Sequence, residues 1–353
     1  MDALGERALP FAAARRVTLP WALVAAGVVV GALLLGVLVG PVHIGLEAIV
    51  RSALARLPFL DVSSPLTTPE DAIVWQLRVP RVALGALVGA MLALAGASYQ
   101  GVFRNPLADP YLLGVAAGAG LGATIVIAYG PAGSTDSYLL PLAAFAGALF
   151  SVVAAWAIGR SLGGERTTAT LILAGVTVAA FLTSAQTFVQ QQNSETLNEV
   201  YSWLLGGLGT AGWREVVLVL PYVAVSVVVL LVHRRALDVL AVGDEEARSL
   251  GLDVARTRLI IVAAATLGTA AAVAVSGLIG FVGIVVPHLV RLVVSSSYRV
   301  ILPLSVALGA SFLVLADVLA RTLLAPAELP IGVVTAFIGA PFFALVLRTS
   351  RSG

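Results

Sequence analysis

The sequence is short of charge and lacks two residue types altogether. Of its 353 residues only 11% are charged, whereas 59% are hydrophobic, and the mean hydropathy is +1.01. Soluble globular proteins carry about 25% charged residues, so this chain cannot cover a water-facing surface with polar groups. The composition therefore excludes a soluble enzyme and a disordered chain, and it predicts a membrane protein.

Cysteine and lysine are the two missing residues, and each absence excludes particular chemistry. Without cysteine there are no disulfides, thiolate metal sites or iron–sulfur clusters. All 21 basic residues are arginine, and both a nucleotide-binding P-loop and Schiff-base chemistry need lysine. The three histidines, His43, His233 and His288, lie far apart in the chain, which disfavours a histidine metal site. We expect no catalytic residue, no metal, no cofactor and no ATP site in this chain.

Long apolar runs are the main feature that is present. A bilayer core of about 30 Å needs roughly 20 apolar residues in a helix, which satisfies the backbone polar groups internally. We predict an all-α polytopic membrane protein with about ten transmembrane helices. Their ranges are about 21–41, 80–100, 111–129, 138–159, 168–190, 214–232, 259–276, 279–294, 301–319 and 331–348. The seventh and eighth ranges are short, and only Gly277 and Leu278 separate them.

The placement of arginine predicts the orientation of these helices. An even number of crossings puts both termini on one side. If that side is the cytoplasm, six arginines lie outside (Arg51, Arg56, Arg78, Arg81, Arg214 and Arg321) and the other fifteen of the 21 lie inside. The positive-inside rule then places both termini in the cytoplasm. The pI near 9.2 therefore reflects membrane topology and not nucleic-acid binding.

We divide the chain into two short tails and one domain in the cell membrane. Residues 1–20 and 349–353 form cytoplasmic tails, and residues 21–348 form a single transmembrane domain. Arg15 and Arg16 followed by an apolar run also resemble a signal peptide. The run is longer than a signal core and no clear cleavage site follows it, which favours a retained helix.

The predicted spans hold almost no ionisable groups, and Asp317 is the exception. Gradient-driven transporters usually carry such groups in the middle of the membrane. Asp317 lies near the outer end of the ninth span, four residues before Arg321, a spacing at which an ion pair forms on one helix face. A structural ion pair is the simpler interpretation, and a gradient-coupled secondary transporter remains the alternative function.

Two predicted cytoplasmic loops are informative. In the longer loop, residues 233–258, Gly243 and Gly251 divide the chain into short helices, and acidic residues begin the second one, where negative charge suits the helix dipole. This loop also contains leucines that would not be exposed without a reason, so it is either a pair of helices on the membrane surface or a docking site for a cytoplasmic partner. In the loop 101–110, two prolines predict a rigid turn.

From about Trp75 to the C-terminus, several spaced motifs occur in order. They are Trp75-Gln-Leu-Arg78-Val-Pro80-Arg81, Gln100-Gly-Val-Phe-Arg-Asn105-Pro106-Leu-Ala-Asp-Pro110, Leu173-Ala-Gly175, Trp203-Leu-Leu-Gly206-Gly207, Gly243-[DE]-x-x-Ala247-Arg248-x-Leu250-Gly251, Gly280-Phe-Val-Gly283-x-x-x-Pro287-His288, Asp317-x-x-x-Arg321 and Glu328-Leu-Pro330. With these motifs the chain resembles the permease subunits of ABC importers for iron(III)-siderophores, haem and cobalamin.

The resemblance implies a type II ABC importer permease fold and a set of partners. Such a permease forms a homodimer in the lipid bilayer, two ABC ATPase subunits that carry ATP and Mg dock below it, and a substrate-binding protein docks outside. The chain itself is then a transport subunit and not an enzyme. The expected cargo is a metal chelate, with an iron(III)-siderophore placed first and cobalamin or haem next. No nucleic acid is expected.

The resemblance also implies roles for particular residues. The ATPase-coupling residues lie in the 233–258 loop, and they are Leu237, Leu240, Gly243, Asp244, Glu245, Ala247, Arg248, Leu250 and Gly251. Arg78 and Arg321 would dock the binding protein, although Arg78 beside Trp75 also suits a lipid-headgroup anchor. Thr167 and Thr168 match an inner gate on the fifth helix, and Gln186 and Gln190 either line the outer pathway or cap the helix in water.

Overall fold

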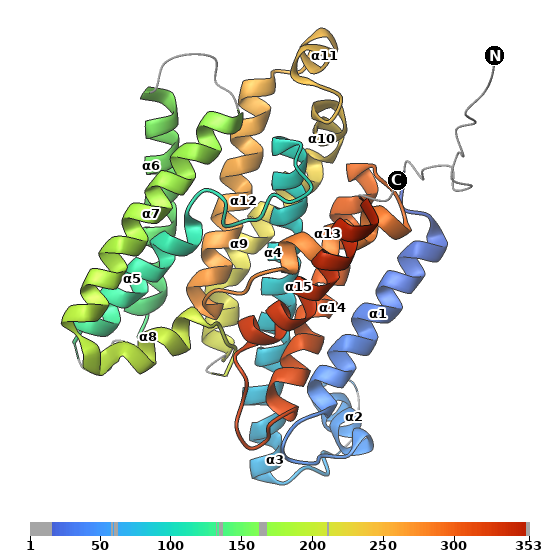
Figure 1. Ribbon diagram of the computed structural model, residues 1–353. Helices are drawn as coiled ribbons and strands as arrows, with labels where there is room; N and C mark the ends of the chain where they lie inside the picture. Colours follow the sequence, from blue (N-terminus) through green and yellow to red (C-terminus); the bar gives the residue numbers. More distant parts are fainter. Residues whose placement is uncertain are drawn as a thin grey trace.

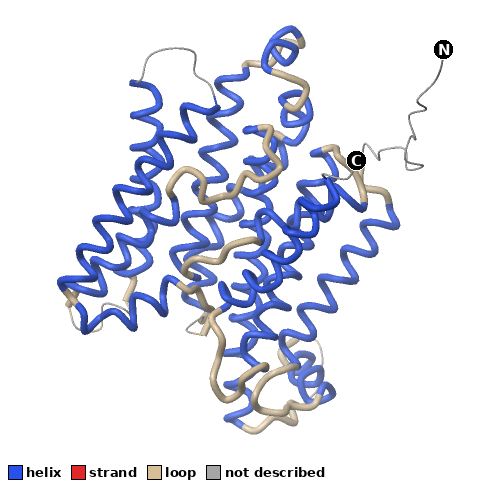
Figure 2. Tube along the Cα trace, in the orientation of Figure 1, coloured by secondary structure: helices blue, strands red, loops and turns tan. Residues whose placement is uncertain are grey.

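The computed structural model describes residues 16–57, 59, 63–131, 133, 137–161, 168–209 and 212–350, and every regular element in these ranges is helical (Figure 2). In chain order the helices are α1 (Leu19–Leu38), α2 (Leu46–Ala55), α3 (Thr68–Ala72), the π-helical η1 (Ile73–Arg78), α4 (Val79–Phe103), α5 (Val115–Tyr129), α6 (Leu139–Ser161), α7 (Thr168–Gln192), the 3₁₀ turn η3 (Ser194–Thr196), α8 (Leu197–Leu204), α9 (Trp213–Val232), α10 (Arg234–Leu240), α11 (Asp244–Ser249), α12 (Val254–Ser276), α13 (Val282–Val293), α14 (Tyr298–Thr322) and α15 (Ile331–Ser350).

Each of the ten predicted spans overlaps one apolar helix, which confirms the all-α prediction. Among the described residues, seven helices are long and apolar enough to cross a membrane, and three shorter apolar ones accompany them: α5, α13 and α15. The helix at the second predicted span begins well before residue 80, because α3, η1 and α4 run on without a break over Thr68–Phe103. The number of crossings, ten, stays a prediction.

Helix α4 is the centre of the molecule. In the most apolar part of the α3–η1–α4 segment, 83% of the residues are buried, and α4 packs against α14, α12, α13 and α9. Small residues allow this packing. A Cβ added to Gly96 would collide with the carbonyl group of Gly283, and one added to Gly89 would collide with that of Gly309. The backbones of α4, α13 and α14 therefore touch, as is usual for helices that associate within a membrane.

Helices α5, α6 and α7 form a second group beside α4, and α1 lies on the outside of α14 (Figure 1). The glycines of α5 allow close contacts with α6. A Cβ on Gly118 would meet the backbone of Gly147 in α6, and a Cβ on Gly122 would meet that of Ala143. This group joins the rest of the bundle through α12, which contacts both α5 and α6.

The chain is not helical between α12 and α13. Gly277 and Phe281 both have a positive φ, and the residues between them continue no helix. The hydroxyl group of Tyr111 donates to the carbonyl of Ile279 (2.9 Å) and accepts from its N–H (3.1 Å). These bonds satisfy backbone groups that would otherwise be unpaired inside the bundle. Because of this break, α13 has only 12 residues, fewer than the predicted range 279–294.

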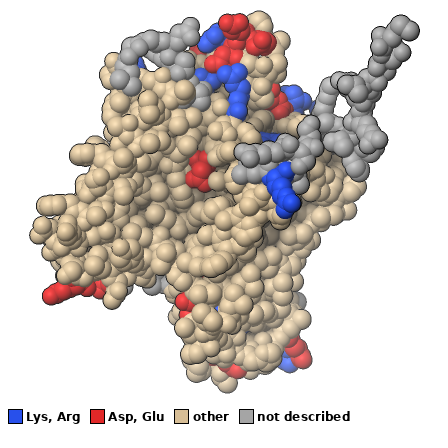
Figure 3. Space-filling model, in the orientation of Figure 1, with Lys and Arg blue, Asp and Glu red and all other residues tan. Residues whose placement is uncertain are grey.

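The bundle has two distinct ends. Helices α10 and α11, the start of α1 and the end of α15 lie toward one end, which we call the α11 end (Figure 1). Helices α2, α3 and α8 lie toward the other, which we call the α2 end. Figure 3 shows acidic and basic side chains gathered at the α11 end, with a broad surface of few charges below them.

Candidate functional site

The 233–258 loop folds as two short helices, and its glycines lie where the sequence predicts. Gly243 (φ +142°) precedes α11 and Gly251 (φ +84°) follows it, and both angles favour glycine. Asp244, Glu245 and Glu246 occupy the first turn of α11, as expected. The division of this loop at Gly243 and Gly251 is therefore confirmed.

The two short helices differ in exposure. Leu237 and Leu240 of α10 are buried, with 0% and 1% of their surface exposed, and α10 packs against α4 and α14. The bundle itself covers these two leucines, and their part in ATPase coupling stays a prediction. Leu250 (70%) and Val242 (65%) remain exposed on either side of α11, whose Ala247 is buried. The large exposed apolar residues of the loop thus flank α11.

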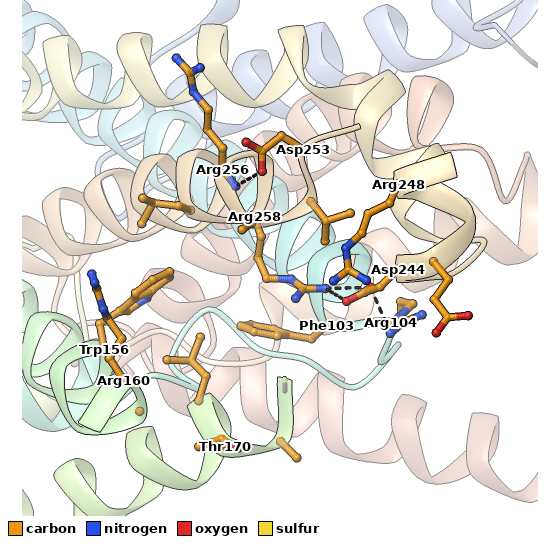
Figure 4. Close-up of a pocket in the computed structure, with 17 residues that line it drawn as sticks. Phe103, Arg104, Trp156, Arg160, Thr170, Asp244, Arg248, Asp253, Arg256 and Arg258 are labelled. Carbon is orange, nitrogen blue, oxygen red and sulfur yellow. Dashed lines mark hydrogen bonds and ion pairs between the residues drawn. The ribbon is translucent and has the colours of Figure 1, made fainter. Parts of the chain in front are cut away.

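Asp244 joins α11 to two long helices. Its carboxylate accepts hydrogen bonds from Nη2 of Arg258 in α12 at 3.1 and 3.2 Å. It also forms an ion pair with Arg104 at 3.3 Å, at the C-terminal end of α4. Figure 4 shows both arginines directed at this carboxylate. A displacement of α11 would therefore pull on α4 and α12 together.

Asp238 makes the equivalent connection for α10. Its carboxylate accepts hydrogen bonds from the N–H of Tyr298 (2.6 Å) and from the hydroxyl of Ser297 (2.9 Å), and it pairs with Arg299 at 3.3 Å. These three residues form the start of α14. Asp238 could not be identified from the sequence, because its partners lie about 60 residues further along the chain and no local pattern links them.

A cavity of about 910 Å³ lies beside Asp244 (Figure 4). It is formed by the ends of α4 and α6, the start of α7, α11 and the start of α12. Its lining residues are Phe103, Arg104, Trp156, Gly159, Arg160, Ala169, Thr170, Leu171, Asp244, Glu245, Arg248, Asp253, Val254, Ala255, Arg256, Arg258 and Leu259. No sequence pattern indicated this cavity, because its walls come from five separate parts of the chain.

The turn after α4 is rigid, as its prolines predict. The N–H of Asn105 donates to the carbonyl of Gln100 (3.1 Å), and the Asn105 side chain accepts from the N–H of Leu107, next to Pro106 (2.9 Å). The Gln100 side chain donates to the carbonyl of Gly283 (3.2 Å). A Cβ at Gly283 would also meet the ring of Pro110. The motif residues therefore fix the α4 turn against α13.

Asp109 lies within this turn and outside the long helices. Its carboxylate accepts a hydrogen bond from the N–H of Tyr111 at 2.7 Å. Burial raises the pKa of Asp109 to about 6, because the charged form is poorly solvated there, and the hydrogen bond from Tyr111 opposes this shift only in part. The carboxylate thus carries a solvation penalty at neutral pH.

The remaining motif residues have structural positions. Pro287 is buried within α13, and the ring of His288 lies edge-on to Phe342 of α15 with 6.1 Å between ring centroids. The carbonyl of Pro330 accepts from the N–H of Val333 at the start of α15 (3.1 Å). Gly280 lies in the α12–α13 break, where an added Cβ would meet no described atom within 4 Å.

At the α2 end, the main partner of Asp317 is Arg81. Arg81 bonds the Asp317 carboxylate through Nη2 (2.8 Å) and Nε (3.0 Å) and also holds Glu328 (2.9 Å). The predicted pair with Arg321 is present but longer, at 3.7 Å. The bond from Arg81 holds the pKa of Glu328, in the α14–α15 loop, below its usual value. The motif Arg78-Val-Pro-Arg81 includes Arg81, but no sequence signal predicts that Arg81 pairs with Asp317.

Arg78 and Arg321 are buried, with 5% and 3% of their surfaces exposed. Arg78 donates to the carbonyls of Val37 (3.0 Å) and Leu38 (3.1 Å) in α1 and to one further carbonyl after α1. Arg321 also donates to a carbonyl of α1. An anchor role for Arg78 in lipid headgroups is wrong for this structure, because its guanidinium lies inside the protein. Docking of a binding protein by these two residues stays a prediction, and neither presents a free guanidinium group at the surface.

Helix α7 carries a continuous exposed stripe. It consists of Leu173, Val176, Thr177, Phe181, Thr183, Ser184, Thr187 and Phe188. The hydroxyls of Thr177, Ser184 and Thr187 donate to carbonyls of their own helix, each at 2.9 Å. The stripe therefore presents mainly carbon atoms and hydroxyls that are already bonded.

The predicted pathway residues on α7 are only partly on this stripe. Gln186 is buried, 7% exposed, and its side chain lies against Gly120 of α5. The prediction that Gln186 is exposed is wrong, because α5 covers its side chain. Gln190 is half-buried. Thr167 lies outside the described residues; Thr168 is the first residue of α7, and the description does not extend to its side chain.

Comparisons with known proteins agree on one group. The model of the FecCD transport family matches residues 28–349, which extends further toward the N-terminus than the motifs that begin near Trp75. The uncharacterized ABC transporter permease YvrB of Bacillus subtilis is 40% identical and covers 91% of both chains. The cobalamin import system permease of Halobacterium salinarum is 40% identical, covering 93% of this chain and 95% of its own.

Solved structures give the same grouping. A structure described as a metal-chelate type ABC transporter in an inward-facing conformation matches with a TM-score of 0.80 and 27% identity, covering 93% of this chain and 98% of its own. PsaBC from Streptococcus pneumoniae shares the fold with a TM-score of 0.55 at 13% identity, over 78% of this chain. The expected importer fold is thus matched by a solved ABC transporter.

Proposed function

This chain belongs to the FecCD transport family, and from that premise we propose that it forms the membrane pathway of an ATP-driven importer for a metal chelate. It is an ABC transporter permease, a multi-pass membrane protein and not an enzyme, and ATP is hydrolysed on a separate subunit. We further propose both termini and the α11 end in the cytoplasm, the α2 end outside, and ten crossings.

The double connection of the α10–α11 pair carries the proposal. Asp238 ties α10 to α14, whereas Asp244 ties α11 to α4 and α12. Val242 and Leu250, exposed on either side of α11, offer an apolar contact for a cytoplasmic partner. An ATPase that moves this surface would act on three long helices through two carboxylates. We propose that this is how ATP hydrolysis opens and closes the pathway.

We propose that the α7 stripe lines the pathway at the axis of a homodimer. An exposed row that mixes leucine, valine, phenylalanine and bonded hydroxyls suits contact with a second copy and with a passing solute. It offers few free hydrogen-bond donors, so it binds cargo weakly. Selectivity then resides in an extracytoplasmic substrate-binding protein that docks at the α2 end.

The proposed cargo class is a metal chelate, and three members of this class are candidates. The resemblance of the sequence favours an iron(III)-siderophore first, with cobalamin and haem next. The Halobacterium relative and that of Escherichia coli O9:H4, the latter 38% identical over 87% of this chain, are named as permeases for cobalamin or vitamin B12. We therefore propose testing cobalamin beside the siderophore. Equilibrium binding of each chelate to the cognate binding protein distinguishes them.

The experiment for the coupling role measures binding of the cognate ATPase to the full chain in nanodiscs. Glu245 of α11 is exposed, so Glu245→Arg changes the docking surface without disturbing a buried contact. Gly243→Pro forces φ to about −65° where the chain needs +142° and should distort the start of α11. The control is Arg235→Gln, an exposed residue of α10.

We expect both α11 variants to bind the ATPase at least about tenfold more weakly, a loss of about 1.4 kcal/mol, while the control binds as the wild type does. If all three variants bind the ATPase as tightly as the wild type does, the proposed coupling role of α11 is contradicted. A gradient-coupled secondary transporter, the alternative, would instead take up cargo with no ATPase present and lose that uptake on Asp317→Asn.

A further inference from the structure

The cavity beside Asp244 carries an excess of positive charge. Its lining includes five arginines but only three acidic residues. Two of the acidic groups are already used, since Asp244 binds Arg104 and Arg258, and Asp253 accepts from the N–H of Arg256 at the start of α12 (3.0 Å). The cavity therefore has more cationic groups than its own carboxylates neutralise.

Three guanidinium groups are available to a ligand. Arg160, in the last turn of α6, and Arg248, in α11, are exposed and form no ion pair with another described residue. The Nε–H of Arg258 is buried and has no hydrogen-bond partner among the described residues. Figure 4 shows Arg248 and Arg258 beside Asp244, while Arg160 stands next to Trp156 across the cavity. An anion beside Arg248 and Arg258 would give both a partner, and Arg160 adds positive charge on the opposite wall.

The walls of the cavity are apolar as well as basic. Phe103, Trp156, Leu171, Val254 and Leu259 contribute to its lining. The volume of about 910 Å³ is far larger than a single inorganic ion needs and lies in the range of sites for organic ligands. A ligand that satisfies both the arginines and the apolar walls has an anionic group attached to hydrocarbon.

The cavity lies at the ends of α6 and α12, beside exposed apolar residues of both helices. Val153 of α6 is 66% exposed and Leu259 of α12 is 46% exposed, so apolar surface continues from the cavity along the bundle. Basic pockets between transmembrane helices at the cytoplasmic boundary suit the headgroups of anionic lipids. The placement of this end in the cytoplasm rests on the proposed function, whereas the charge and shape of the cavity do not.

We propose that this cavity binds the headgroup of an anionic phospholipid, with Arg248 and Arg258 beside its phosphate and with Arg160 and Trp156, on the opposite wall, against its glycerol and first methylene groups. The bound phosphate would compete with Asp244 for Arg258. Anionic lipid would then weaken the connection between α11 and α12. The lipid thereby becomes a regulator of the coupling element.

Native mass spectrometry of the purified full chain tests the site without any ATPase. The probes are phosphatidylglycerol and, as a zwitterionic match, phosphatidylcholine with the same acyl chains. The variant is Arg160→Gln/Arg248→Gln, and the control is Arg235→Gln, which removes an exposed charge at the same end of the molecule outside the cavity. We expect the wild type and the control to retain phosphatidylglycerol in preference, and the double variant to bind it at least about tenfold more weakly.

Three results would overturn the proposal. They are equal retention of both lipids by the wild type, undiminished phosphatidylglycerol binding by the double variant, and displacement of the lipid by millimolar inorganic phosphate, which would assign the cavity to a soluble anion. If the double variant does not fold, a second measurement is used instead: quenching of tryptophan fluorescence by brominated phosphatidylglycerol. We expect Trp156→Phe to lose part of that quenching, and quenching that is unchanged would contradict the site.

A second readout separates this proposal from the coupling role of α11. If phosphatidylglycerol binds at the arginines but the α11 variants bind the ATPase as the wild type does, the lipid site stands and the proposed function fails. If the ATPase binds α11 while the double variant retains phosphatidylglycerol, the proposed function stands and the lipid site fails.

Discussion

The two ends of the molecule use arginine in opposite ways. At the α2 end, Arg78 and Arg321 are buried and the Arg81 side chain is only 12% exposed, and all three bond to carboxylates or to carbonyls in and after α1. At the α11 end, Arg160 and Arg248 are exposed and pair with no described residue. A buried charge is costly unless it is paired, so the first group fixes one arrangement of helices. The second group leaves the α11 end free to bind other molecules.

The carboxylates show the same contrast. Asp317 is buried between two arginines, and its side chain is 3% exposed. Asp244 is 26% exposed and is held at 3.1–3.3 Å by arginines that water also reaches. Partly exposed pairs are weaker and exchange more easily. The α2 end is thus built as a fixed platform, and the α11 end as a part that can move.

The largest effect should follow from breaking the buried network. Asp317→Asn leaves Arg81 and Arg321 without their buried counter-charge, and we expect a loss of about 3–5 kcal/mol in the free energy of unfolding. Thermal unfolding in detergent measures it. Glu47→Gln, which removes the exposed partner of Arg51 in α2, is the control and should change stability by less than about 1 kcal/mol. Similar losses for both variants would contradict the contrast between buried and exposed charge.

Asp244→Asn should mainly affect activity. The amide still fills the space, so we expect folding to be nearly unchanged, but its bonds to Arg258 and Arg104 lose their charge. Stimulation of the partner ATPase by loaded binding protein should then fall about tenfold, equivalent to about 1.4 kcal/mol. A large loss of stability with normal stimulation would instead make Asp244 a structural residue like Asp317.

Arg78→Lys examines the fixed platform without removing charge. Lysine cannot reproduce the several carbonyl bonds of the guanidinium group, so we expect about 1–3 kcal/mol of lost stability. Affinity for the binding protein is measured on the same variant. Weaker docking at unchanged stability would restore the docking role and contradict the structural one.

The smallest effect concerns pH at the rim of the platform. The bond from Arg81 lowers the pKa of Glu328, so the pair stabilises the fold above the unfolded value of 4.5 and loses this effect as the pH falls through the lowered pKa. Because the Glu328 side chain is 42% exposed, Glu328→Gln should cost no more than about 1 kcal/mol at pH 7. The difference from wild type should vanish well below pH 4.5, and a difference that grows on acidification would reverse the assigned sign.

Local chemistry made much of the fold predictable. Apolar runs located the long helices, and Gly243 and Gly251 located the ends of α11, because each signal depends on neighbouring residues alone. The pairings of Asp244 with Arg258, Asp238 with Tyr298 and Asp317 with Arg81 depend on how distant helices pack. The burial of Arg78 could not be predicted for the same reason, because α1 covers this side chain and no pattern near residue 78 indicates that contact.

ATP dependence of uptake tests the central claim most directly. The full chain is reconstituted into proteoliposomes with its cognate ATPase and loaded binding protein, and chelate uptake is followed with and without ATP and with ion gradients collapsed. We predict uptake that needs ATP and the ATPase, persists without a gradient, and falls about tenfold in Asp244→Asn. Uptake that continues without ATP and stops when the gradients collapse would contradict this account.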